Sequence, residues 1–189
     1  MLFVVPPYLG MDEINTGEPE SWFTSVTVPL GVISIAAYVG KYADVNFSVL
    51  DLNVSIAKHA DKFMCTKWED FLKDELSEFL KKETPDVVGI SAIFNSQIGY
   101  IDKISTYSKE FWPKTIVVSG GGGVGTSMSS EVFERAPKLD AIATGEAEIP
   151  VLNLFKAPLK LEYLEEGKGG KQEIELSKVN SSCRILLKI

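Results

Sequence analysis

Five short segments of the sequence place glycine, hydroxyl, amide or carboxylate groups, or a pair of prolines, directly after an apolar run. They are residues 6–7, 51–53, 91–95, 119–123 and 144–146. Small residues let a backbone approach a ligand closely, and a few polar groups then fix the orientation of that ligand. Each glycine could equally serve only to turn the chain between a strand and a helix. Because glycine occurs in several of these segments, we favour the interpretation that the segments together form one ligand-binding surface.

The apolar runs before these segments predict five buried strands. They cover residues 2–5, 46–51, 85–91, 115–119 and 140–144, and short apolar runs of this kind are typical of parallel strands covered on both faces. Helical patterns follow at about 29–42, 66–80, 98–111, 127–135 and 148–155. This alternation predicts an α/β protein with a doubly wound, flavodoxin-like (Rossmann-like) five-stranded parallel sheet in an α/β/α sandwich. In such a sheet ligands bind beyond the carboxyl ends of the strands, where all five segments would meet.

Two helices carry specific local predictions. The apolar stretch of residues 28–40 predicts a buried helix, with Pro29 at its start where the missing N–H is harmless. Thr66 and Glu69 have the spacing of a capping box, which predicts that a helix opens there.

The end of the chain breaks the alternation of strands and helices. We therefore predict one α/β domain over residues 1–155, followed by a linker and tail over 156–189. The glycines and lysines of residues 167–171 indicate a flexible linker. Residues 172–179 and 184–189 are either short strands or an unpacked tail, and the whole tail is either partly disordered or the start of a further domain.

Charge and cysteine usage exclude several classes of function. The net charge is −7, and residues 1–154 hold 12 lysines and arginines against 21 acids. A nucleic-acid partner is therefore not expected, since binding nucleic acid needs clustered cations. No apolar stretch is long enough to span a bilayer. Cys65 and Cys183 have no metal-ligand spacing, so we expect no iron–sulfur cluster in this chain and a reducing, cytoplasmic location.

Three other features can be interpreted either as functional or as structural. Residues 120–125 match the dinucleotide fingerprint G-x-G-x-x-G, but they follow the fourth strand, and Asp140 begins its strand instead of ending it. His59, the single histidine, lies in a polar segment and is expected to be a solvated bystander. Glu146 and Glu148 either favour the start of a helix by their charge or anchor a ligand.

The five strand regions, taken in order, carry a recognisable set of motifs. They read VPLGVISIAAY at 28–38, VLDLN at 49–53, PDVVGISA at 85–92, VVSGG at 117–121 and DAIATGE at 140–146. Over residues 1–155 this set resembles the N-terminal cobalamin (B12)-binding domain of B12-dependent radical SAM proteins.

The resemblance implies a cobalamin held over the carboxyl ends of the strands, with its nucleotide tail in the crevice and its corrin ring facing a catalytic domain. Such a module presents the corrinoid for methyl transfer or radical chemistry that a separate radical SAM domain or subunit performs. The C-x-x-x-C-x-x-C motif of that domain does not occur in this sequence. No catalytic residue is therefore expected here.

The strand ends and the resemblance together name the residues expected to contact the cofactor. They are Pro6, Pro7, Asp51, Asn53, Ser91, Ala92, Asn95, Gly120, Gly121, Gly122, Gly145 and Glu146. The Asp-x-His-x-x-Gly signature of other cobalamin domains is absent, with Asn53 where its histidine would stand. The resemblance thus implies that no protein histidine ligates the cobalt.

The residues leave three other functions open. One is a flavin- or dinucleotide-binding protein that uses the Gly120–Gly125 loop, a second is a phosphoacceptor domain, and a third is a domain without a ligand. Trp22 and Phe23, in the long loop of residues 8–27, would either cover a bound ring or pack onto the first helix.

Overall fold

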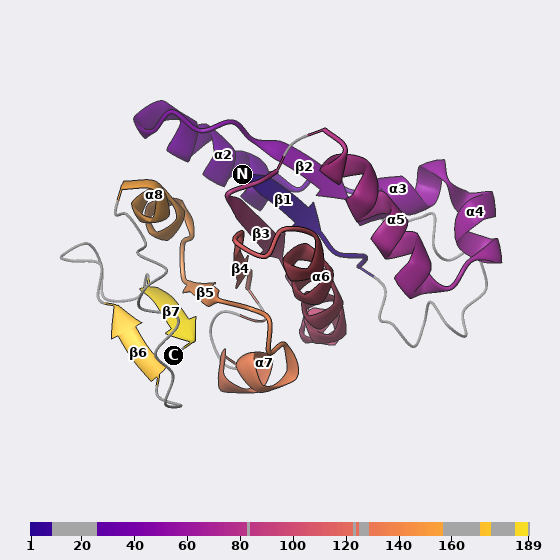
Figure 1. Cartoon of the computed structure of the whole chain (residues 1–189). Helices are drawn as coiled ribbons and strands as arrows, with labels where there is room; N and C mark the ends of the chain where they lie inside the picture. Colours follow the sequence, from indigo (N-terminus) through magenta and orange to yellow (C-terminus); the bar gives the residue numbers. More distant parts are fainter. Residues whose placement is uncertain are drawn as a thin grey trace.

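A seven-stranded sheet in the order β2-β1-β3-β4-β5-β7-β6 forms the centre of the molecule (Figure 1). The computed structural model describes residues 1–8, 26–82, 84–122, 124, 129–156, 171–174 and 184–188. Five strands are parallel: β1 (Leu2–Val5), β2 (Ser48–Asp51), β3 (Val87–Ser91), β4 (Ile116–Gly120) and β5 (Ala141–Thr144). Their order is flavodoxin-like, as predicted.

Two further strands extend the sheet beyond β5. β7 (Arg184–Lys188) pairs antiparallel with β5, and β6 (Lys171–Ile174) pairs antiparallel with β7. β7 falls within residues 184–189, which the sequence left open between strand and tail, whereas β6 begins at Lys171, the last residue of the predicted linker, and continues into the open segment 172–179. The domain boundary at residue 155 remains a prediction.

Helices cover both faces of the sheet (Figure 1). One face carries α2 (Leu30–Tyr42) and α8 (Glu148–Lys156), which pack side by side. The other face carries α3 (Leu52–Lys58), α4 (Ala60–Cys65), α5 (Trp68–Leu80), α6 (Ile98–Phe111) and α7 (Ser129–Arg135). A short 3-10 helix, η2 (Asn95–Gln97), leads from β3 into α6.

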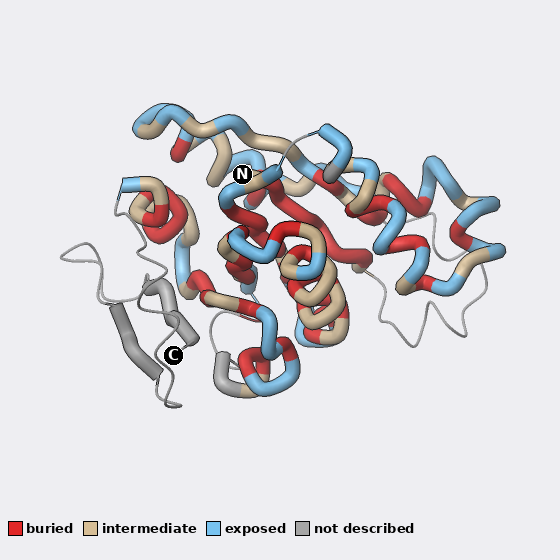
Figure 2. Tube along the Cα trace, viewed as in Figure 1, coloured by how far each residue is buried: buried red, intermediate tan, exposed pale blue. Residues whose placement is uncertain are grey.

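The main core lies between the sheet and α3–α7. Alternate strand residues point to opposite faces, so Leu2 and Val4 join this core, whereas Phe3 and Val5 pack against α2. All of the largest fully buried side chains of the described residues belong to the main core, among them Tyr100 of α6. Figure 2 shows these buried strands in the middle and exposed turns on the outer helices.

Two local predictions are wrong. The helix α2 is not buried all round, because it packs against the sheet and α8 on one side only: Leu30 is 73% exposed and Ile33 is 48% exposed. Thr66 and Glu69 do not form a capping box. Thr66 instead ends α4, and α5 begins after Lys67 without a side-chain cap.

The ends of β3 and β4 approach each other closely at Gly121. This glycine has a φ of +129°, and a Cβ atom there would lie 1.9 Å from the carbonyl oxygen of Ala92. The Ala92 N–H also donates to the Gly120 carbonyl oxygen at 2.8 Å. Only a residue without a side chain fits this crossing.

We therefore expect Gly121→Ala to lower the free energy of unfolding by more than about 1 kcal/mol, because the new methyl group clashes and the backbone is strained. The control is Gly122→Ala, whose Cβ would have no heavy atom within 4 Å outside its chain neighbours. Urea unfolding of both variants checks this. Equal stabilities would contradict the crossing as described.

Candidate functional site

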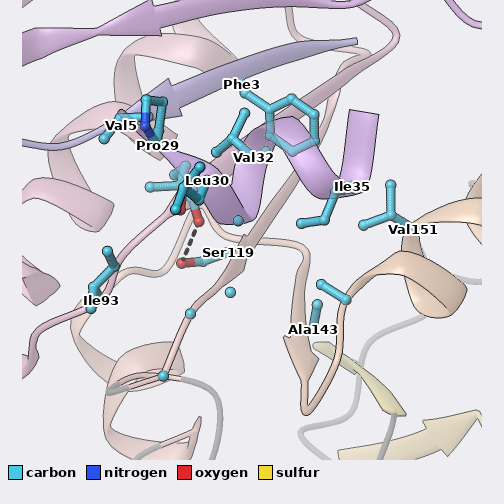
Figure 3. Close-up of a pocket in the computed structure, with 18 of the residues that line it drawn as sticks. Phe3, Val5, Pro29, Leu30, Val32, Ile35, Ile93, Ser119, Ala143 and Val151 are labelled. Atoms are coloured by element: carbon cyan, nitrogen blue, oxygen red, sulfur yellow. Dashed lines mark hydrogen bonds between the residues drawn. The ribbon is translucent and has the colours of Figure 1, made fainter. Parts of the chain in front are cut away.

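A groove of about 900 Å³ lies between the sheet and the helices α2 and α8 (Figure 3). Its floor is formed by β1, β3, β4 and β5, and it reaches the carboxyl ends of these strands. This volume is in the range of sites that enclose small molecules. The groove therefore lies at the edge of the sheet where the sequence predicts a ligand.

Small residues stand in the strand-end row of this sheet face, whereas larger side chains cover the row behind it. In the pairing register, Gly89 of β3 lies between Phe3 and Val118, and two residues further on Ser91 pairs with Gly120, which pairs with Ala143. A Cβ at Gly89 would lie 2.7 Å from the Met1 Cε and 2.9 Å from the Phe3 Cδ1. The absence of a side chain at Gly89 thus gives these two side chains room to lie over the strand.

The helices supply apolar walls. Val32 and Ile35 of α2 and Val151 of α8 line the groove together with Phe3 (Figure 3). The Ser34 hydroxyl of α2 donates to Oε1 of Glu148 in the first turn of α8, at 2.7 Å. This bond joins the two walls, so the width of the groove depends on both helices.

The mouth of the groove combines exposed apolar side chains with a carboxylate. Val28 is 65% exposed, Ile93 is 45% exposed and Phe94 is 49% exposed, and all three line the groove. Glu146 is also exposed there, after Gly145, whose φ is +71°. Exposed apolar groups that gather at an opening are typical of a binding surface.

Half of the predicted contact residues line the groove. They are Ser91, Gly120, Gly121, Gly122, Gly145 and Glu146. The other six, which do not line it, are Pro6, Pro7, Asp51, Asn53, Ala92 and Asn95. Ala92 lies behind Gly121, and Asn95 is exposed on η2. Trp22 and Phe23 lie outside the described residues.

Asn53 holds the loop that follows β1. Its Oδ1 accepts a hydrogen bond from the Tyr8 N–H at 2.9 Å, and its Nδ2 donates to the Pro6 carbonyl oxygen at 3.1 Å and to Asp51 Oδ1 at 2.9 Å. Asp51 Oδ1 in turn accepts from the Asn53 N–H at the start of α3. Asn53 is buried and fully engaged, which is the environment of a structural residue.

Gln97 is a second such residue, and sequence reasoning missed it. Its Nε2 donates to the Pro7 carbonyl oxygen at 2.8 Å, and its Oε1 accepts from the N–H groups of Ile93 and Phe94 at 2.7 and 2.9 Å. It therefore joins the loops after β1 and β3 beside the groove mouth. No local pattern marks this glutamine, whereas Gly89 could have been found, because glycine inside a strand often marks a close approach.

Titratable groups with shifted pKa values lie away from the groove. A hydrogen bond and the charge of Lys81 lower the pKa of Glu78 on α5, and burial raises the pKa of Tyr107 on α6. His59 Nδ1 lies 3.1 Å from Glu75 Oε1, also on the α5 side of the sheet.

The described residues contain neither a candidate metal site nor a helix that could span a membrane. Within these ranges, no group of three or more histidine, cysteine, aspartate or glutamate side chains is placed to hold a metal ion. None of the helices within them is long and apolar enough to cross a bilayer.

Asp140 does not serve a dinucleotide. Its Oδ2 accepts from the Val117 N–H at 2.7 Å and pairs with Lys109 Nζ at 2.6 Å. These contacts lie at the amino ends of β4 and β5, opposite the groove mouth, as the sequence predicted. The dinucleotide alternative for residues 120–125 is accordingly not favoured.

Comparison with known proteins gives consistent matches. Residues 23–155 match the model of the B12 binding domain. Over 160 residues the chain is 31% identical to an anaerobic magnesium-protoporphyrin IX monomethyl ester cyclase of Rubrivivax gelatinosus, covering 83% of this chain and 24% of that protein. Over 136 residues it is 29% identical to a cytidylyl-2-hydroxyethylphosphonate methyltransferase of Streptomyces wedmorensis, covering 67% of this chain and 24% of that protein. The chain thus spans about a quarter of the length of these relatives.

The Asn53 side chain forms three hydrogen bonds with the loop after β1 and with Asp51. We expect Asn53→Ala to lower the free energy of unfolding by about 1–3 kcal/mol, because the buried partners lose these hydrogen bonds. The exposed Asn95 provides the control, and Asn95→Ala should change stability little. Thermal or urea unfolding measures both. A neutral Asn53→Ala would contradict the structural role.

Proposed function

The chain belongs to the B12-binding domain family, and we propose that it binds a cobalamin with the nucleotide tail in the groove and the corrin ring on the groove mouth. This role rests most directly on the groove itself, which opens at the carboxyl ends of the strands and is lined by apolar side chains of the sheet, α2 and α8.

The groove fits the shape of the nucleotide tail. A cobalamin is a wide, planar corrin macrocycle with amide arms, and a flat aromatic base hangs from it on a ribose-phosphate tail. The strand-end row of the floor carries only small residues at Gly120 and Ala143, and Phe3, Val32 and Val151 provide the apolar contacts that an aromatic ring needs. The macrocycle with its arms is too wide to enter beside the base and would stay outside.

The mouth fits the corrin ring. Val28, Ile93 and Phe94 offer an apolar surface to the face of the ring, and the Glu146 carboxylate can accept N–H groups from its amide arms. Asn53 is already engaged in three hydrogen bonds and is not expected to ligate cobalt. A base of the nucleotide tail that is inserted in the groove would also not coordinate the cobalt.

When bound, cobalamin supplies a cobalt centre that carries a methyl group or takes part in radical reactions. The chain's own residues bind the tail, orient the ring and leave its outer face open to a partner. We propose that this partner is a radical SAM catalytic domain or subunit, in the cytoplasm. The matched relatives, a cyclase and a methyltransferase by name, are about four times longer than the matched segment.

Binding is tested by mixing the purified protein with hydroxocobalamin, desalting it and recording the visible spectrum. We expect about one corrinoid per chain. Failure of the folded protein to retain any corrinoid, or retention of a flavin in its place, would overturn the proposed function.

The location of the site is tested on α2 with two glycines that differ in their relation to the groove. Gly31 lines the groove, and a Cβ there would have open space around it; Gly40 is exposed on the same helix and does not line the groove. We expect Gly31→Trp to weaken hydroxocobalamin binding about tenfold or more by filling the mouth, and Gly40→Trp to leave it unchanged. Equal affinities would show that the ligand binds elsewhere.

A further inference from the structure

We infer that the groove selects among corrinoids by the polarity of the base on the nucleotide tail. It favours a base that carries only alkyl groups on its benzene ring, such as dimethylbenzimidazole, over a purine such as adenine. This inference rests on the proposed function, in which the tail enters the groove, and it adds which class of corrinoid this chain retains.

Among the residues that the structure describes, those that line the inner part of the groove are apolar. Two residues back from the strand ends, the floor consists of Phe3, Gly89 and Val118. Ile35 of α2 and Val151 of α8 face this part of the groove (Figure 3). The backbone groups between these strands are used in the β-ladder.

The polar side chains that line the groove either form hydrogen bonds within the protein or lie closer to the groove mouth than the inner row does. The Ser119 hydroxyl donates to the Ile90 carbonyl oxygen at 3.3 Å, and Glu148 accepts from the Ser34 hydroxyl at 2.7 Å. Ser91 and Glu146 stand at the strand ends, where the sugar and phosphate of the tail and the amide arms of the corrin would pass. Among the described residues, none of these groups reaches the inner row.

This distribution sets the expected preference. Dimethylbenzimidazole and adenine both carry the imidazole nitrogen that can bind cobalt. Burial of this nitrogen therefore does not favour either base over the other. Adenine adds an exocyclic amine and two ring nitrogens, which lose their water and find no partner in an apolar groove. The methyl groups of dimethylbenzimidazole instead gain contact with the valine and isoleucine side chains. We expect cobalamin to bind about tenfold tighter, or more, than the corresponding adenine-containing corrinoid.

The test compares three ligands on the whole chain by absorbance titration: cobalamin, the adenine-containing corrinoid and cobinamide, which lacks the nucleotide tail. The inference expects that order of affinity. Equal affinity for cobalamin and the adenine form would overturn the selection while leaving the proposed function intact. Binding of none of the three would instead refute the proposed function, and binding of cobinamide as tight as cobalamin would refute the placement of the tail.

A variant pair tests the origin of the preference. Val118→Thr adds a hydroxyl to the inner floor, and we expect it to reduce the preference for cobalamin several-fold. Val49→Thr is the control, since Val49 is 41% exposed on β2 and does not line the groove. If Val118→Thr does not fold, Ile35→Thr on α2 places a hydroxyl against the same inner part of the groove. An unchanged preference in a folded groove variant would overturn the inference.

Discussion

The small residues in the strand-end row of one sheet face, Ser91, Gly120 and Ala143, are the constraint on which the groove depends. Gly89 and Gly120 occupy register positions where a parallel sheet normally carries branched apolar residues. Gly120 raises no side chain from the sheet, whereas the Met1 and Phe3 side chains cover Gly89, and the groove lies between this sheet face and the helices α2 and α8. A groove of this size that opens at the carboxyl ends of parallel strands is typical of a ligand site.

The loops at the groove mouth are held in place by hydrogen bonds over long sequence distances. Asn53 and Gln97 come from the segments after β2 and β3, yet Asn53 donates to the Pro6 carbonyl oxygen and Gln97 to the Pro7 carbonyl oxygen after β1. At the other side of the mouth, Gly121 allows the end of β4 to pass against Ala92. A mouth fixed before the ligand arrives loses less conformational entropy on binding. The residues that do not line the groove therefore still contribute to it.

The sequence predicted the strand order and the edge of the sheet where the groove lies, because both follow from the alternation of apolar runs and turns. It could not separate the residues that line the groove from those that support it. Asn53 and Gln97 have the same polar character as a ligand contact, and only tertiary structure shows that their amides are occupied. The exposure of α2 was also missed, since an apolar helix pattern does not show how many neighbours the helix has. The apparent capping box at Thr66 failed because α4 already uses that residue as its end.

One face of the sheet contributes most to the stability of the fold, and the other face carries the groove. The largest buried side chains of the described residues pack on the α5 and α6 face, where burial of apolar area stabilises the fold. The α2 and α8 face packs less completely at its groove, where part of the apolar lining is open to solvent. A ligand that covers this lining does so in the folded state alone, so binding and folding are linked. Saturation with cobalamin should then raise the unfolding temperature of the domain, which thermal unfolding with and without the ligand measures.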